Sequence, residues 1–139
     1  METARHATLT QSVIGAFFQV YNRLGFGFLE AHYAAALERE LRKLGLHVLR
    51  ECAVQVFYDG VEIGFHRLDM VVEGKVVAEL KSGPALPPHA RRQLYSYLRA
   101  TSLEVGVLLY FGPQLRFQRM YVPNPLGSME RRIKQEPGT

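Results

Sequence analysis

The chain has 139 residues, of which 47% are hydrophobic, so it can build one domain with a sizeable core and is not a disordered protein. Its 17 Lys and Arg residues against 13 Asp and Glu give a net charge of +4, which is compatible with a polyanionic partner without requiring one. The single cysteine, Cys52, excludes an internal disulfide and a cysteine-based zinc site. The sequence has no apolar leader and no apolar run of membrane-spanning length, so we expect a cytoplasmic protein with no membrane partner.

Two helices are predicted at the start of the chain. Thr8 followed by Gln11 resembles a capping box, and the apolar residues behind it predict a helix over about 10–24. A second helix is predicted over about 29–44, with an apolar stripe made of Leu29, Tyr33, Ala36, Leu37, Leu41 and Leu44. Glu30 projects inside this stripe, so it either reaches past the core into a cleft or lies in water at the end of the stripe.

Three strands follow as an antiparallel meander. Val-rich and aromatic runs predict strands over 47–58, 61–72 and 76–81. The first two are joined by Asp59-Gly60, a strong hairpin turn.

The turn between the last two strands determines where the ionisable residues of the meander lie. Glu73-Gly74 is a weak two-residue turn, and glycine favours a bulged loop of three residues. A three-residue loop brings Asp69 and Glu79 to one face of the hairpin, whereas a two-residue turn separates them. We therefore predict a shared face, with Lys81 on the same side as Glu79 because the two are two residues apart on one strand. Two carboxylates can hold a hard divalent cation, and an ammonium beside them can hold a phosphate.

The rest of the chain alternates between helix and strand. A helix is predicted over about 89–101, with a buried face formed by Ala90, Leu94, Tyr97 and Thr101. The apolar run 105–111 is typical of a central strand covered on both faces, and 115–121 alternates as a strand with one exposed face. We interpret residues 1–125 as a single domain and 126–139 as a flexible C-terminal tail.

The order of these elements resembles the PD-(D/E)xK nuclease superfamily. Asp69 on the second strand and Glu79-Leu80-Lys81 on the third match its metal-site pattern, although Leu68 stands where the superfamily name has Pro. The resemblance covers about residues 10–121 and implies an α/β (α+β) fold with a restriction-endonuclease-like core. In that core an antiparallel three-stranded meander belongs to a mixed sheet flanked by helices.

Two further motifs resemble one small family of this superfamily. The stretch from Gly27 through Glu30 to Tyr33 fits the GxxExxY signature that names the family. Gln93-Leu-Tyr-Ser-Tyr97-Leu resembles the helix motif of the same family, with Ser96 where Asn is usual.

The resemblance implies a metal-dependent nuclease. Asp69, Glu79 and the backbone carbonyl of Leu80 would be ligands of Mg²⁺ or Mn²⁺, and Glu30 would be an additional carboxylate that helps the metal or its water. Lys81 would orient the attacking water or stabilise the phosphate. The alternative interpretation of this polar set is a salt-bridged cluster at a sheet edge.

The resemblance also implies a nucleic-acid substrate, with DNA favoured over RNA. Gln93 and Tyr97 would line the cleft and position the substrate backbone, and Tyr33 would bind substrate or pack in the core. Two other functions stay open: a nucleic-acid-binding module without turnover, and a protein-interaction subunit that forms a homodimer through the strand edge at 115–121.

Overall fold

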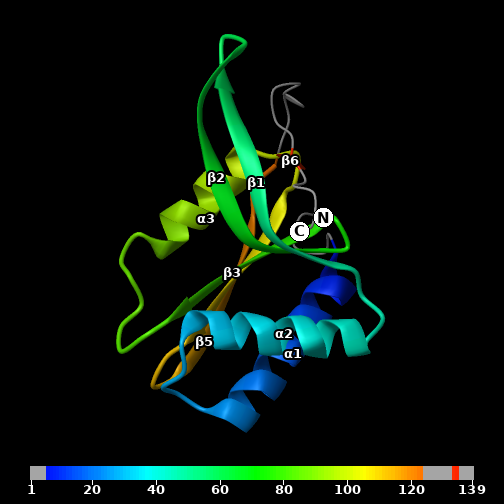
Figure 1. The fold of residues 1–139 in the computed structure, drawn as a ribbon, viewed down its shortest axis with the longest axis vertical. Helices are drawn as coiled ribbons and strands as arrows, with labels where there is room; N and C mark the ends of the chain where they lie inside the picture. Colours follow the sequence, from blue (N-terminus) through cyan, green and yellow to red (C-terminus); the bar gives the residue numbers. More distant parts are fainter. Residues whose placement is uncertain (1–5, 124–132, 135–139) are drawn as a thin grey trace.

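A mixed six-stranded sheet with helices on both faces forms the protein (Figure 1). The computed structural model describes residues 6–123 and 133–134. The elements, in chain order, are α1 (Ala7–Leu24), α2 (Glu30–Lys43), β1 (Val48–Tyr58), β2 (Val61–Val72), β3 (Val76–Ser82), α3 (Ala90–Arg99), β4 (Val105–Phe111), β5 (Leu115–Tyr121) and β6 (Ile133–Lys134). The strand order is β5-β4-β3-β2-β1-β6, and the β3–β4 pair is parallel while the other pairs are antiparallel. The predicted α+β architecture with its antiparallel meander is confirmed.

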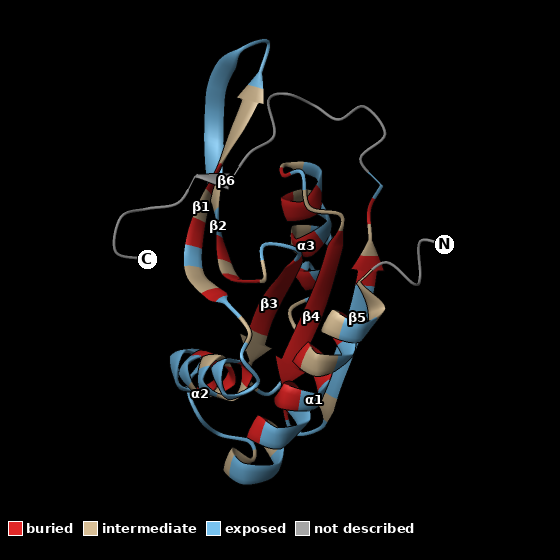
Figure 2. Ribbon diagram, turned by 90° about the vertical axis from the view of Figure 1, so that its right-hand side faces the viewer, coloured by how far each residue is buried: buried red, intermediate tan, exposed pale blue. Residues whose placement is uncertain are grey.

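The core lies on both faces of β3 and β4. Helices α1 and α2 pack on one face, where Phe17 and Leu37 are fully buried, and α3 packs on the other through Leu94 and Leu98. Every residue of β4 is buried, as the apolar run predicted, because helices cover a parallel strand pair on both sides. Figure 2 shows β3 and β4 as the buried centre of the molecule.

The first helix begins earlier than predicted and ends at Leu24 as predicted, and α2 is one residue shorter at each end than predicted. Helix α1 begins at Ala7, so Thr8 lies inside its first turn and cannot act as the N-cap; among the described residues α1 has no side-chain cap. Leu29 and Leu44 flank α2 and are 67% and 59% exposed, because the stripe that meets the sheet ends with the helix at Lys43.

The turn between β2 and β3 is the predicted three-residue loop. The paired residues are Met70↔Ala78, Val71↔Val77 and Val72↔Val76, which leaves residues 73–75 in the loop. Glu73 and Gly74 both have left-handed backbone conformations, with φ of 56° and 64°. This register brings Asp69 and Glu79 to one face of the hairpin, as predicted.

The sheet forks next to Met70, where β2 separates from β3. In the described part of the chain, the β2–β3 ladder ends at Met70, and β2 continues with β1 alone up to the Asp59-Gly60 turn. Figure 1 shows β1 and β2 rising together above the rest of the sheet. We call residues 53–66 the arm; its tip exposes apolar side chains at Tyr58, Val61, Ile63 and Phe65.

Most of the predicted C-terminal tail lies outside the described residues. Of the range 126–139, the structure describes Ile133–Lys134, which pair as β6 with Val54 and Ala53 of β1. In the described residues, no helix is both long enough and apolar enough to span a membrane.

Candidate active site

The candidate site occupies the fork between β2 and β3. Beyond Ala78, the edge of β3 is no longer paired with β2, so its backbone groups need other partners. The Leu80 amide donates to Asp69 Oδ2 at 2.8 Å, and the Ser82 backbone donates to the carboxylate of Glu30. Two carboxylates from different elements are thus held against the same open strand edge.

Glu79 is the most deeply buried ionisable side chain of the site. Its residue is 3% exposed, and burial, with the neighbouring charge of Asp69, raises its pKa from 4.5 to about 8. Its Oε1 atom is buried and has no hydrogen-bond partner among the described residues. An unpaired carboxylate oxygen in such a place is costly unless a cation or a proton satisfies it.

Asp69 is half-buried beside Glu79. Burial raises the pKa of Asp69, while the hydrogen bond from Leu80 and the positive charge of Lys81 act in the opposite direction. The two adjacent carboxyl groups repel each other when both are ionised, so the pair favours either one shared proton or one bound cation.

Lys81 links the carboxylates to α3. Its Nζ lies 3.5 Å from Glu79 Oε2 and donates to Gln93 Oε1 at 2.8 Å. Gln93 therefore fixes the ammonium group beside the carboxylate pair.

Tyr97 and His66 form the wall of the site on the α3 side. Their rings lie 4.8 Å apart, and His66 Nε2 is 3.4 Å from Ser96 Oγ. Burial and the carboxylates of Glu79 and Asp69 raise the pKa of Tyr97 to about 12, which places this phenol near the carboxylate pair. The sequence analysis did not include His66 in the site.

Glu30 approaches the site from the other side of the sheet. As the first residue of α2 it remains exposed at the surface, and burial of its carboxyl and the charge of Asp69 raise its pKa. It lines a cavity of about 300 Å³ together with Asp69 and Leu80. Glu30 thus lies both at the exposed end of the helix stripe and at the cavity that Asp69 lines.

Of the two roles left open for Tyr33, the structure shows packing in the core and contradicts substrate binding. Its side chain is 0% exposed and stacks on Phe111 with ring centroids 4.1 Å apart. Its hydroxyl donates to the Gly25 carbonyl and accepts from the Phe28 amide. A fully buried side chain cannot contact substrate, so Tyr33 anchors the α1–α2 loop to the core.

The donor set of the fork fits a hard divalent cation. Asp69 and Glu79 provide carboxylate oxygens, one of which is buried and unpaired. Because the amide and carbonyl of one strand residue point to the same side, the Leu80 carbonyl is expected on the side of Asp69. In the described residues no three His, Cys, Asp or Glu side chains form a ready-made metal cluster.

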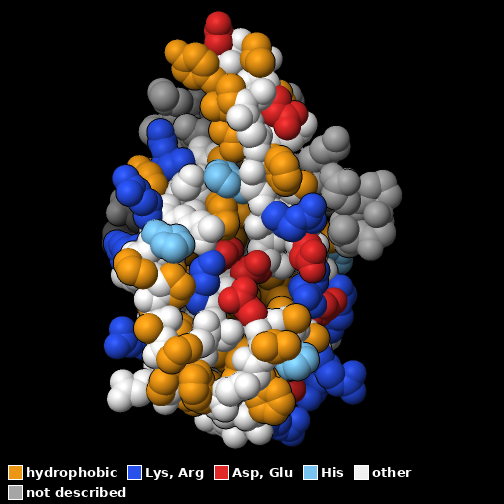
Figure 3. Space-filling view, turned by 60° about the vertical axis from the view of Figure 1, so that its left-hand side comes forward, with side chains coloured by type: hydrophobic (Ala, Val, Ile, Leu, Met, Phe, Trp, Pro, Cys, Tyr) orange, Lys and Arg blue, Asp and Glu red, His pale blue; other side chains and the backbone are white. Residues whose placement is uncertain are grey.

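Two arginines near the carboxylates are not among the predicted site residues. Arg50 of β1 and Arg67 of β2 line the same cavity as Asp69 and Glu30. Figure 3 shows acidic side chains gathered at the centre of one face, with basic side chains on both sides of them. Arg67 could have been included because it lies two residues before Asp69, but no sequence pattern relates Arg50 to Asp69.

The fold and the fork together define the class of the protein: a restriction-endonuclease-like domain with two carboxylates and a lysine at the point where its sheet divides. The sequence matches the PD-(D/E)XK nuclease superfamily over residues 7–120, and the chain belongs to this superfamily.

One solved structure supports the fold independently. It is described as the crystal structure of SSO0001 and is 21% identical, with a TM-score of 0.53 over 86% of this chain and 61% of that chain. At this identity the likeness shows the fold. No curated protein matches the sequence.

Proposed function

We propose that the protein is a metal-dependent nuclease that hydrolyses phosphodiester bonds, with DNA as its substrate and Mg²⁺ or Mn²⁺ as its cofactor. The observation that carries this proposal is the buried, unpaired oxygen of Glu79 beside Asp69 and Lys81 at the fork, in a chain of a nuclease superfamily. A carboxylate arranged in this way suits a cation, and the adjacent ammonium group suits a phosphate.

Asp69, Glu79 and the Leu80 carbonyl would hold the cation. When bound, the cation supplies positive charge to the scissile phosphate and makes the attacking water easier to deprotonate. Water adds its oxygen to phosphorus, the bond from phosphorus to the leaving sugar oxygen breaks, and that oxygen gains a proton. The products are one strand end with a phosphate and one with a hydroxyl group.

The remaining residues of the fork would position the reactants. Lys81, held by Gln93, would orient the water or stabilise negative charge that develops on the phosphate. Glu30 would accept a hydrogen bond from water at the cavity side, and Tyr97 would contact the substrate backbone from α3.

The chain is also proposed to be of the GxxExxY type. Gly27 has a φ of 119°, which glycine adopts easily, and it lies in the loop that Tyr33 anchors. Glu30 directly follows this loop. These positions give the motif a physical purpose: the Gly and Tyr shape the loop that delivers the Glu to the fork.

A cleavage assay tests the proposal. Labelled single-stranded, duplex and branched DNA, and RNA, are incubated with MgCl₂ or MnCl₂ and, separately, with EDTA. Wild type is compared with Asp69→Ala and Lys81→Ala, with the far-edge variant Arg119→Ala as a control. We expect metal-dependent cutting of DNA that both site variants lose and the control keeps.

The opposite results are equally informative. Cutting that survives both site substitutions comes from a contaminant and removes the support for this site. Salt-sensitive binding without cutting identifies a nucleic-acid-binding module that keeps the nuclease fold.

A further inference from the structure

We infer that Arg50 and Arg67 form a binding site for a backbone phosphate next to the scissile one, and that Glu38 positions Arg50 for this task. The inference rests on the proposed function, because it extends the same cleft by one phosphate of the substrate. The evidence for it is a network of ion pairs and hydrogen bonds around Glu38, which lies on the α2 side of the fork, opposite Lys81.

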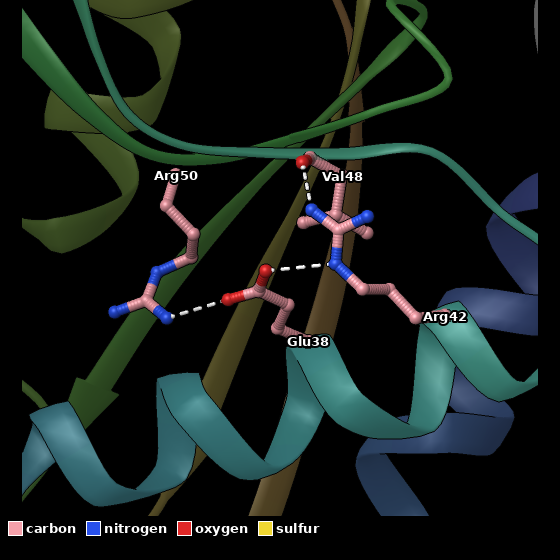
Figure 4. A network of polar contacts seen from close by, with 4 residues as sticks. All are labelled: Glu38, Arg42, Val48 and Arg50. Atoms are coloured by element: carbon pink, nitrogen blue, oxygen red, sulfur yellow. Dashed lines mark hydrogen bonds and ion pairs between the residues drawn. The ribbon is translucent and has the colours of Figure 1, made fainter. Parts of the chain in front are cut away.

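Glu38 holds two guanidinium groups at once (Figure 4). Its Oε1 accepts from Arg50 Nη1 at 3.0 Å, and its Oε2 accepts from Arg42 Nε at 2.8 Å. Arg42 in turn donates to the Val48 carbonyl at 2.7 Å. Arg42 is therefore tied to the backbone of β1, and it fixes the carboxylate that orients Arg50.

The charges of this network leave an excess positive charge at Arg50. Although burial acts in the opposite direction, hydrogen bonds from Arg42 and Arg50 lower the pKa of Glu38, so this carboxylate is ionised near neutral pH. One carboxylate then faces two guanidinium groups. The Arg50 side chain is 27% exposed. Its guanidinium group has more N–H donors than the hydrogen bond to Glu38 uses, so the remaining donors can bind a ligand.

The exposed part of Arg50 belongs to the cavity of the site. Arg50, Arg67, Asp69 and Glu30 all line the same hollow of about 300 Å³. The positive charge of Arg50 also acts to lower the pKa of Asp69, so the two groups are within electrostatic reach of each other. One wall of the cavity thus carries carboxylates suited to a cation, and the neighbouring wall carries guanidinium groups suited to an anion.

The carboxylates that line the cavity oppose anion binding: Asp69 and Glu30, described above, and Glu51. Glu51 lies on its rim, with an exposed side chain, and its backbone carbonyl accepts from Arg67 Nη1 at 3.3 Å. A phosphate is therefore attracted most when a cation offsets the charge of Asp69. Binding of the phosphate and of the cation should support each other.

The positions of Arg50 and Arg67 suit the phosphate next to the scissile one. Lys81 is turned toward Gln93 on the α3 side, whereas Arg50 and Arg67 lie on the α2 side, with Asp69 between the two groups. A strand that places one phosphate against the cation and Lys81 can place the next against the arginines. The ligand class is thus a phosphodiester strand that carries a charged linkage beside the one that is cut.

Binding of modified oligonucleotides tests this inference. A labelled single-stranded oligodeoxynucleotide is made in versions that carry one uncharged methylphosphonate linkage at successive positions. Affinity is measured by fluorescence anisotropy with CaCl₂ in place of MgCl₂, for wild type, Arg50→Ala, Arg50→Lys, Glu38→Gln and the matched control Arg119→Ala, whose arginine is exposed on β5. Denaturation midpoints of all variants show that they are folded.

We expect one methylphosphonate position to weaken binding to wild type by about tenfold, as loss of a charge-assisted hydrogen bond does. The same position should weaken binding to Arg50→Ala less than it weakens binding to wild type, because Arg67 is then the one remaining arginine that contacts the phosphate. Glu38→Gln should give an intermediate result, since Arg50 keeps its charge and loses its orientation. Arg50→Lys should recover only part of the effect, because an ammonium group cannot make the planar two-point contact.

Two outcomes would overturn the inference: equal sensitivity of wild type and Arg50→Ala at every position, or a response of Arg119→Ala that matches that of Arg50→Ala. Failure of the nuclease proposal is seen separately, as absence of cutting with MgCl₂ or MnCl₂. Because the anisotropy assay needs no turnover, a protein that binds without cutting still gives a decisive result for the arginine site.

Discussion

Glu79 carries a carboxyl group where water barely reaches it, and one of its oxygens is left without a partner in the described structure. Each unit by which a pKa is shifted corresponds to about 1.4 kcal/mol of difference between the two protonation states. A shift from 4.5 to about 8 means that ionising Glu79 in the metal-free protein costs a few kcal/mol. This cost explains why the position suits a cation, which replaces the proton.

The pKa of Glu79 predicts how stability depends on pH without metal. The folded-state pKa is raised, so the stability contributed by the proton is complete below pH 4.5 and is lost as pH rises through about 8. Glu79→Gln lacks this dependence. The free energy of unfolding of the variant minus that of wild type should therefore grow by about 1 kcal/mol per pH unit between pH 5 and 8.

Urea denaturation in EDTA at several pH values measures this difference. Titrating groups that do not interact with Glu79 cancel when the two proteins are compared at each pH. A difference that stays constant across this range would show that Glu79 titrates normally.

Gln93 is expected to act by holding Lys81 in place. In Gln93→Leu the ammonium group loses its acceptor at 2.8 Å but keeps its charge. We expect the single-turnover cleavage rate to fall by about tenfold, the value of one hydrogen bond to a charged group, with an unchanged dependence on metal concentration. Gln118→Leu, a matched change on the exposed side of β5, should leave the rate unaltered. A shifted metal dependence would instead assign Gln93 to the metal site.

At the scale of elements, the loop between α1 and α2 determines where Glu30 lies. Tyr33 ties this loop to the core with two hydrogen bonds and a stacked contact with Phe111. The loop has few other described hydrogen bonds, so these contacts decide its position.

Two substitutions of Tyr33 separate the hydrogen bonds from the packing. Tyr33→Phe should lower the free energy of unfolding by about 1–2 kcal/mol, and Tyr33→Ala by about 3–5 kcal/mol because it also leaves a cavity. Chemical denaturation measures both. If Tyr33→Phe were as stable as wild type, the hydroxyl would not anchor the loop.

Gly112 illustrates how closely the strand end packs beside the site. A Cβ atom at this position would lie 2.2 Å from the ring of Tyr110, and that ring is held because its hydroxyl donates to the Gly83 carbonyl at 2.7 Å. Gly112→Ala should therefore cost about 2 kcal/mol of stability, as overpacking of a core does. In a Tyr110→Ala background the same substitution should cost much less, and a double-mutant cycle by urea denaturation detects this. Additive effects would contradict the proposed clash.

At the scale of the whole molecule, a cation held by Asp69 and Glu79, as proposed, would join β2 to the central strand β3 where the ladder between them ends, and so should stabilise the fold. A ligand present at about 100 times its Kd adds about 2.7 kcal/mol, which corresponds to a rise in Tm of roughly 5–10 °C for a domain of this size. Thermal denaturation with MnCl₂, against NaCl of equal ionic strength, measures the rise. The double variant Asp69→Asn, Glu79→Gln should lose it; an equal rise in that variant would locate the metal elsewhere.

The sequence by itself determined the local features. The apolar run 105–111 predicted a strand covered on both faces, and a single glycine beside Glu73 predicted the three-residue loop that sets Asp69 across from Glu79. Such features depend on neighbours close in the chain, because side-chain alternation and turn geometry act over a few residues.

Only the tertiary structure decided the rest of the site. The role of Tyr33 depended on Phe111, and the position of Arg50 depended on Glu38 of another element. The fork itself arises because β2 leaves β3 after Met70, which no local pattern records. Burial and charge pairing are set by residues far apart in the chain, so the sequence could name the carboxylates and the lysine, whereas the fold determined which groups surround them.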